Sequence, residues 1–318
     1  MAEEFTTWDN LLKEFKFYMT MERSFSQNTS ESYIFDCSRF VDFMKEKHKD
    51  ISPNEVSVNI LEEFIFSLEK KQYDDEEDIL LKSTTQTRII QGIRAFFKFL
   101  ILNDNIDSNP SELLVTPKLE KKLPDILERE EVKALLNIFD TSTSHGFRNR
   151  LTIALLYSTG LRVSEFINLK LYEINFREEF LDIIGKGNKE RFVPVESSVL
   201  NELEYYIEHF RANQYIKKGE EDYVFISNKR GSKLTRQFIF KMLRESAAKA
   251  GINKTIHPHI LRHSFATELI RSGANIIAVK EMMGHTSIRS TEVYINLDTK
   301  DLRKTLLENH PFYQKDFF

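Results

Sequence analysis

The chain has 318 residues, of which 41% are hydrophobic and 30% are charged. This composition is ordinary for a soluble globular protein, and the length predicts two domains. Cys37 is the only cysteine, which excludes an internal disulfide and favours a cytoplasmic protein. The N-terminus lacks a signal-peptide pattern, and no run approaches the ~18 apolar residues of a membrane helix. We therefore expect no membrane anchor.

The net charge of −4 argues against nucleic-acid binding when taken as a single number, because phosphate contacts need Lys and Arg. Its distribution argues otherwise. Residues 1–116 hold 13 basic and 22 acidic residues, whereas residues 117–318 hold 32 basic and 27 acidic ones. Between residues 229 and 254, Glu245 is the one acidic residue among eight basic ones. This stretch is typical of a DNA-binding surface or, alternatively, of an ordinary solvated helix face.

The N-terminal part has the pattern of a small helical bundle. Apolar residues three and four positions apart predict helices over residues 7–20, 28–47, 57–71 and 84–102. Asn28, Thr29 and Ser30 resemble helix-capping residues at the start of the second of these. The acidic segment 74–78 predicts a surface loop, and no strand pattern competes with the helices.

Prolines mark the end of this bundle. Asn109-Pro110, Pro117 and Pro124 break the helical pattern around a polar run. We therefore predict an N-terminal domain over residues 1–116, a linker over 117–126 and a C-terminal domain over 127–318.

The C-terminal domain is predicted to be mainly α with a small antiparallel β-sheet. Helices are expected over residues 129–139 and 148–158, followed by a hairpin whose strands cover 180–184 and 191–195. Residues 223–227 are a candidate third strand. Nearly all of the chain beyond them has helical patterns.

The phrase Thr159-Gly160-Leu161-Arg162-Val163-Ser164-Glu165 places an arginine just after a glycine, where a helix is expected to begin. Helix N-termini favour anions, and a guanidinium can hold a phosphate through two parallel hydrogen bonds. The phrase therefore fits a phosphate site. An ordinary surface pair between Arg162 and Glu165 is the alternative interpretation.

A second cluster runs from His257 through Arg262 to His263, and continues with Met283-Gly284-His285 and, nine residues later, Tyr294. His259 and His263 stand four residues apart, so a zinc site is one interpretation. It lacks support, because the chain has no second cysteine and no carboxylate at the spacing of known zinc motifs. No nucleotide-binding motif is visible either, and we expect neither a metal nor another cofactor.

Together these segments resemble the tyrosine recombinases of the Xer and phage-integrase type. The resemblance rests on T-G-L-R-x-S-E, a lysine in G-K-G-x-K-x-R, H-x-L-R-H, M-G-H and the later tyrosine, in that order. It extends to Ser26-Gln27-Asn28-Thr29, to residues 94–100 and to Leu123-Pro124, and so covers almost the whole chain. It implies an N-terminal helical core-binding domain of SAM-like fold and a C-terminal α+β catalytic domain. Met283 replaces the family's frequent leucine, a volume-conserving change.

Carried over by motif position, the resemblance implies a phosphate clamp and a nucleophile. Arg162 and Arg262 become the clamp, His285 a further phosphate donor, and Tyr294 the nucleophile. Two guanidiniums and an imidazole can stabilise the charge on the non-bridging oxygens without a metal ion. A covalent phosphotyrosyl bond keeps the energy of the phosphodiester, so no ATP is implied.

The resemblance also implies two proton-transfer groups. A tyrosine with a pKa near ~10 must lose its proton as it attacks, while the departing 5′-oxygen must gain one. His259 suits the first task. Lys186 suits the second, since a lysine on a short hairpin loop can swing into the DNA minor groove. We interpret His257 and His263 as structural.

The partners implied are a double-stranded DNA recombination site and three further copies in a homotetramer on synapsed DNA, with a homologous recombinase or an accessory protein as a further possibility. In the family the aromatic C-terminal segment, residues 308–318 here, reaches into the neighbouring protomer. Its folding back onto its own domain is the alternative. The basic residues expected to contact DNA are Arg88, Arg94, Lys98, Lys229, Arg230, Lys233, Arg236, Lys241 and Arg244.

Two other functions remain open at this point. A type IB topoisomerase shares this chemistry but relaxes DNA without exchanging partners, and the N-terminal bundle argues against it. A catalytically silent DNA-binding or architectural module would need only the basic surface. The retention of every candidate catalytic side chain argues against that module.

Overall fold

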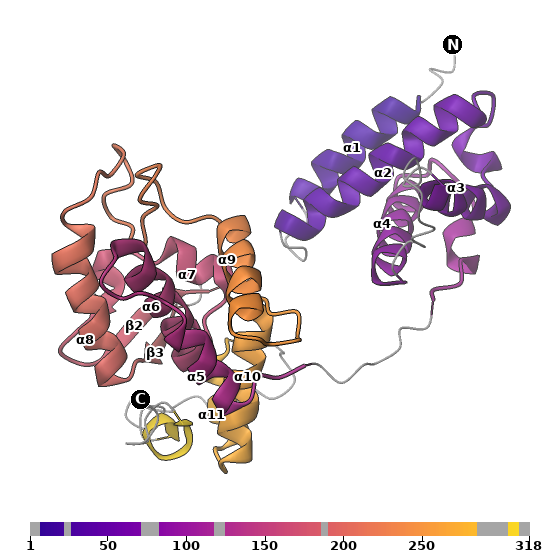
Figure 1. The fold of residues 1–318 in the computed structure, drawn as a ribbon. Coiled ribbons are helices and arrows are strands. Elements are labelled where there is room, and N and C mark those ends of the chain that lie inside the picture. The colour runs from indigo at the N-terminus through magenta and orange to yellow at the C-terminus, as the bar shows by residue number, and fades with distance from the viewer. Residues whose placement is uncertain are drawn as a thin grey trace. The chain divides into compact units, whose positions relative to one another are not determined.

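The computed structural model describes residues 7–21, 27–70, 83–117, 125–185, 190–284 and 305–311. The chain divides into two compact units, Met1–Lys122 and Leu123–Phe318, and each is mostly helical (Figure 1). A three-stranded antiparallel sheet lies in the second unit. The predicted fold class, mainly α with a small antiparallel sheet, is confirmed. Within the described ranges, no helix combines the length and the apolar character needed to cross a membrane.

The first unit packs its helices around a core rich in phenylalanine. Its helices are α1 (Trp8–Met21), α2 (Gln27–Lys47), α3 (Val58–Lys70) and α4 (Ser83–Leu102), with 3-10 turns η1 (Pro53–Glu55) and η2 (Pro110–Leu113). The Phe40 ring meets Phe64 at 5.3 Å and Phe97 at 5.8 Å between centroids, both edge to face. Such aromatic pairs stabilise a core beyond the area they bury.

One local expectation about this unit is wrong. Helix α2 begins at Gln27, so Asn28, Thr29 and Ser30 lie inside its first turn and do not precede it as caps. The Ser30 hydroxyl donates instead to the Met19 carbonyl of α1, 3.4 Å away. The Ser30 side chain therefore connects α2 to α1.

Two arginines predicted to contact DNA have partners inside the first unit. Arg88 of α4 pairs with the buried carboxylate of Asp36 on α2. Arg94 donates to the carbonyls of Ser111, at 3.2 Å, and Leu114, at 2.7 Å, and so holds the chain that follows the bundle against α4. Lys98, by contrast, is exposed.

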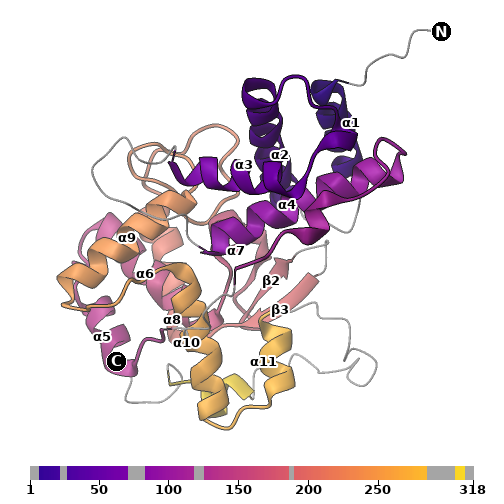
Figure 2. The same ribbon diagram turned by 90° about the vertical axis from the view of Figure 1, so that its right-hand side faces the viewer.

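The second unit is built around two buried helices, α6 (Ser144–Thr159) and α10 (Pro258–Arg271), which pack on each other. Figures 1 and 2 show α5 (Arg129–Asn137), α8 (Ser197–Tyr205), α9 (Arg236–Lys249) and α11 (Ile276–Met282) around them. Helix α8 continues into a π-helical turn, η4 (Tyr206–Arg211). Residues 151–159 of α6 are all buried, which explains why this helix has no polar face.

The sheet confirms the predicted hairpin but not the predicted third strand. Strands β2 (Phe180–Ile184) and β3 (Glu190–Pro194) pair in register Ile183↔Arg191, and the third strand is β1 (Ile174–Asn175) after the 3-10 turn η3 (Leu171–Glu173). Residues 223–227 form only isolated bridges, such as Ile226 to Lys233. Their apolar run is explained by burial of Val224, Phe225 and Ile226 in the core and not by sheet pairing.

The C-terminal segment packs on its own unit. Residues 305–309 form a helical turn whose Leu306 joins a buried cluster with residues of α10 and α11 (Figure 2). The His310 ring is fully buried and lies 5.1 Å from the Tyr157 ring and 5.2 Å from the Phe265 ring. Folding back, the alternative considered for this segment, is therefore what the structure shows for residues 305–311. Residues 312–318 lie outside the described ranges.

Candidate active site

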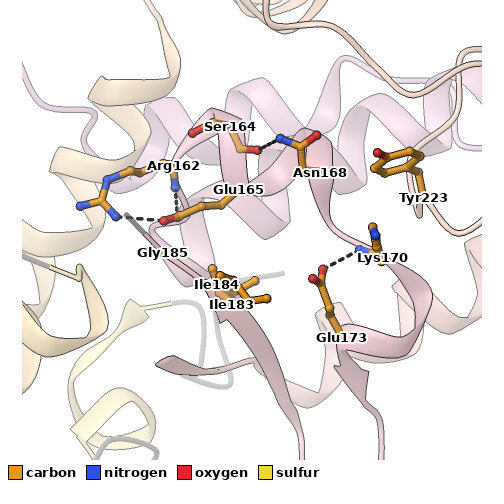
Figure 3. Close-up of a pocket in the computed structure, with 10 residues that line it drawn as sticks. All are labelled: Arg162, Ser164, Glu165, Asn168, Lys170, Glu173, Ile183, Ile184, Gly185 and Tyr223. Atoms are coloured by element: carbon orange, nitrogen blue, oxygen red, sulfur yellow. Dashed lines mark hydrogen bonds and ion pairs between the residues drawn. The ribbon is translucent and has the colours of Figure 1, made fainter. Parts of the chain in front are cut away.

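Arg162 occupies the turn between α6 and the short helix α7 (Val163–Asn168). Gly160 ends α6 at φ +61°, and a Cβ there would stand 2.4 Å from the Phe265 ring, so this position requires glycine. Arg162 is the N-cap of α7. Its backbone N–H donates to Glu165 Oε2 at 2.8 Å, and its Nη1 donates to Glu165 Oε1 at 2.9 Å (Figure 3).

Arg262 is brought next to Arg162 from helix α10. Its side chain is buried, and it donates to the Gly160 carbonyl at 2.5 Å and to the Met283 carbonyl. Arg162 Nη2 donates to the next carbonyl, that of Gly284, at 2.8 Å. The two guanidiniums thus hold the two residues that precede His285 in the chain.

The electrostatics of this arginine pair favour an anion. Burial lowers the pKa of Arg262 to about 10, and the positive charge of Arg162 adds to the effect. Arg262 nevertheless stays charged at neutral pH. Two neighbouring cations repel each other unless an anion lies between them, and two guanidiniums in this arrangement suit the non-bridging oxygens of a phosphate.

Arg191 of β3 completes this group, and sequence reasoning did not single it out. Its Nη1 and Nη2 donate to the two oxygens of Glu165 at 2.9 and 2.7 Å, and its Nε donates to the Met282 carbonyl at 3.1 Å. Glu165 is 7% exposed, so its pairing with Arg162 is not the ordinary surface pair that was the alternative. Arg191 is the final letter of G-K-G-x-K-x-R, the one signal that pointed to it.

Glu165 stays ionised because it serves both arginines. Its burial alone would raise the pKa, but hydrogen bonds and charge from Arg191, and then from Arg162, lower it. The group therefore carries three guanidiniums and one carboxylate. Its net charge is positive, as a site for phosphate requires.

His259 lies on the same helix as Arg262, three residues earlier. Both line a cavity of about 470 Å³ together with His257, His263 and Met283. His259 is exposed, which suits a group that exchanges protons with a substrate, whereas His257 and His263 are half-buried. Burial, and then the neighbouring His259, lower the pKa of His257. Nowhere in the described ranges do three or more metal-ligating side chains gather around one point.

A second cavity, of about 460 Å³, opens beside Arg162 (Figure 3). Ser164, Asn168, Lys170 and Tyr223 line it, and so does Gly185, which directly precedes Lys186 in the chain. The Tyr223 ring lies 5.9 Å from Lys170 Nζ and 4.3 Å from Lys233 Nζ, and Lys233 also donates to Asn168 Oδ1 at 2.6 Å. Lys170 therefore lines the cavity itself, together with the carboxylates of Glu165 and Glu173, while Lys233 contacts two of the lining residues, Asn168 and Tyr223.

Three of the six predicted catalytic residues lie outside the described ranges, namely Lys186, His285 and Tyr294. Of the other three, Arg162 is the N-cap of α7, and His259 and Arg262 belong to α10. The structure brings the two arginines together at the turn before His285, and it places His259 on the cavity that Arg262 lines.

The basic residues predicted to contact DNA in the second unit gather around a third cavity, of about 800 Å³. Four of them line it, namely Lys229, Arg230, Lys233 and Lys241. The other two, Arg236 and Arg244, are exposed on α9. Sequence reasoning missed Arg148 beneath them. Arg148 donates to the Ile226 carbonyl at 3.0 Å and lies 5.0 Å from the Phe238 ring, so it holds the loop that carries these residues.

Comparison with known proteins identifies the family. Residues 125–301 match the model of the phage integrase family, and residues 12–104 match that of the phage integrase N-terminal SAM-like domain. The tyrosine recombinase XerD of Staphylococcus epidermidis is 36% identical over 306 residues, covering 95% of this chain and 99% of that protein. XerD of Staphylococcus aureus is 37% identical over 304 residues, with the same coverage.

Solved structures show the same fold. The XerH site-specific recombinase bound to its difH substrate matches with a TM-score of 0.66 and 22% identity, covering 95% of this chain and 97% of that one. The Tn1549 transposon integrase in complex with circular intermediate DNA matches with a TM-score of 0.67 and 19% identity, covering 92% and 98%. None of these relatives supports a topoisomerase or a silent architectural module. The chain therefore belongs to the phage integrase family and is a tyrosine recombinase, an enzyme of site-specific recombination.

Proposed function

We propose that this recombinase binds a duplex recombination site and cuts it with Tyr294. The tyrosine oxygen attacks the scissile phosphorus, the bond to the 5′-oxygen breaks, and a 3′-phosphotyrosyl intermediate forms. The 5′-hydroxyl of a second strand then attacks this intermediate and releases the tyrosine. Exchange of one strand pair yields a Holliday junction, and exchange of the second pair resolves it.

The observation that carries this proposal is the pair Arg162 and Arg262, joined to successive carbonyls of one turn. The pair can hold the non-bridging oxygens of the scissile phosphate and stabilise the charge of the transition state. We assign His285 as a further donor to the same oxygens. The proton of Tyr294 goes to His259, and Lys186 supplies the proton for the leaving 5′-oxygen.

Binding to the duplex is assigned to the basic surface. The exposed side chains of Lys229, Arg230, Arg236, Lys241 and Arg244 support phosphate contacts by the catalytic domain, as does the exposed Lys98 for the N-terminal domain. Arg88 and Arg94 have internal partners, so any DNA contact they make would be shared with those. Relatives solved as DNA complexes support the same role for this chain.

We also propose residues 117–126 as the linker between domains 1–116 and 127–318, a placement supported by the division of the two compact units after Lys122. The active form on synapsed DNA is a homotetramer in the cytoplasm, in which the C-terminal segment leaves its own domain for a neighbour. A homologous recombinase or an accessory protein is a further candidate partner.

A nicked suicide substrate tests the chemistry. Tyr294→Phe removes one oxygen, so we expect it to abolish the covalent protein–DNA adduct and to leave binding in gel shifts unchanged. Tyr215→Phe is the matched control, because its ring is 73% exposed and should not affect cleavage. An adduct with Tyr294→Phe would mean that another residue is the nucleophile. Strand exchange between two duplexes separates recombination from topoisomerase activity.

A further inference from the structure

Arg191 stands at a junction of three elements that the mechanism uses. It belongs to β3, an edge strand of the sheet, five residues after Lys186. Its side chain leaves the hairpin to reach Glu165 on α7 and the Met282 carbonyl at the end of α11. The hairpin of Lys186, the helix of Arg162 and the chain that leads to His285 therefore share one side chain.

The contacts of Arg191 depend on the planar shape of its guanidinium as well as on its positive charge. Its two terminal nitrogens each bond one oxygen of Glu165, the planar bidentate arrangement that a lysine cannot reproduce. Both side chains are buried, Arg191 at 10% and Glu165 at 7% exposure. A pair held this tightly in the interior restricts the position of the strand from which the arginine comes.

Close packing at Gly284 reinforces this restriction. A Cβ on Gly284 would lie 3.3 Å from the Cδ and Cζ of Arg191 and 3.3 Å from Nη1 of Arg162. Both arginine side chains therefore lie close to the backbone of the turn that precedes His285. The hydrogen bond from Arg191 Nε to the Met282 carbonyl thus connects β3 to the chain just before this turn.

We infer that Arg191 is a positioning residue, which sets the hairpin carrying Lys186 against the arginine pair and the turn before His285. Arg162 makes bonds to Glu165 and to the Gly284 carbonyl that do not involve Arg191, so we expect these bonds to persist in an Arg191 variant. The edge strand β3 would lose its polar connection to both α7 and α11. The main loss then falls on proton delivery by Lys186, so the inference rests on the proposed function of that lysine.

The test uses single-turnover cleavage by Arg191→Gln and Arg191→Lys on two nicked substrates. One has the natural 5′-oxygen leaving group, and the other has a 5′-bridging sulfur, which leaves without needing a proton. Arg177→Gln is the control, because this arginine lies in the same sheet region with a side chain 93% exposed. Lys186→Ala runs in parallel, and gel shifts and thermal unfolding check that each variant binds DNA and folds.

We expect both Arg191 variants to cleave natural DNA about 100-fold more slowly, the loss expected from a small misplacement of a reacting group. The sulfur substrate should restore most of this loss, as it should for Lys186→Ala, while Arg177→Gln behaves as wild type on both. Arg191→Lys retains the charge, so a wild-type rate for this variant would overturn the inference.

Rescue of Lys186→Ala without rescue of Arg191→Gln would also overturn the inference and leave the proposed function intact. Failure of the sulfur substrate to rescue Lys186→Ala itself would instead refute the general-acid role of Lys186, on which the inference rests. The two failures are thus distinguishable within one experiment.

Discussion

Gly284, the glycine of the M-G-H motif, is the position at which a single methyl group should disturb the whole site. Its φ of +61° lies in the left-handed region that favours glycine. An added Cβ would also meet Arg162 Nη1 and two carbon atoms of Arg191, all at 3.3 Å. Contacts this short require the neighbouring side chains to shift by a few tenths of an ångström.

The expected effect of Gly284→Ala follows from the strain of a left-handed alanine and from the short contacts of its Cβ. A left-handed alanine costs about 1–2 kcal/mol. The turn can relieve this strain only by rotating, which moves the Met283 and Gly284 carbonyls away from Arg262 and Arg162. A misplacement of the phosphate-binding groups of about 1 Å reduces the rate on the order of 100-fold. We therefore expect cleavage 10- to 100-fold slower, about the range that such a misplacement allows.

Gly251→Ala separates strain from damage to the site. Gly251 has a φ of +70°, but a Cβ there would meet nothing within 4 Å. Both variants should lose about 1–2 kcal/mol of stability, roughly 2–4 °C in Tm for each kcal/mol in a domain of this size. Only Gly284→Ala should slow the single-turnover cleavage of a suicide substrate. Wild-type cleavage by Gly284→Ala, with the same loss of stability as Gly251→Ala, would refute the role assigned to this turn.

Three further predictions concern pH, metal ions and the C-terminal segment. Burial lowers the pKa of His310 to about 3, so the folded state keeps it neutral while the unfolded chain takes up a proton below its ordinary value of 6.5. Stability should therefore fall between pH 6.5 and 3, and His310→Gln should flatten this fall in unfolding experiments; equal slopes would contradict the assignment. Cleavage should survive EDTA, because guanidiniums neutralise the charge of the phosphate. Loss of cleavage in EDTA, followed by its recovery when Mg²⁺ or Zn²⁺ is added, would refute this. Deletion of residues 308–318 should spare binding to one site and weaken recombination of two duplexes. It should also lower Tm, because it exposes the surface that His310 covers. A wild-type recombination rate would exclude the proposed insertion of the C-terminal segment into a neighbouring protomer.

Local patterns in the sequence were sufficient for the four helices of the first unit, for the hairpin and for the family, but they did not predict α8 or β1. Apolar residues three and four positions apart predict a helix, and a short turn between two strands predicts a hairpin. Both patterns lie within a few residues of the chain, so they can be recognised without the tertiary structure. Arg162 and Arg262 could be named for the same reason, since each lies in a short motif with its glycine or histidines. The pattern failed at residues 223–227, where an apolar run looked like a strand but is buried as an irregular segment.

Only the tertiary structure decided which groups share a partner. Glu165 is joined to Arg191 across 26 positions of sequence, and Arg162 to Gly284 across 122, distances over which no periodicity or spacing carries information. The same holds for Arg94, whose basic side chain is committed to carbonyls of its own unit. It holds also for residues 305–311, since their apolar character required burial but did not specify against which domain. The residue type determines what kind of group a side chain can bind, whereas the fold determines which such group lies close enough to be bound.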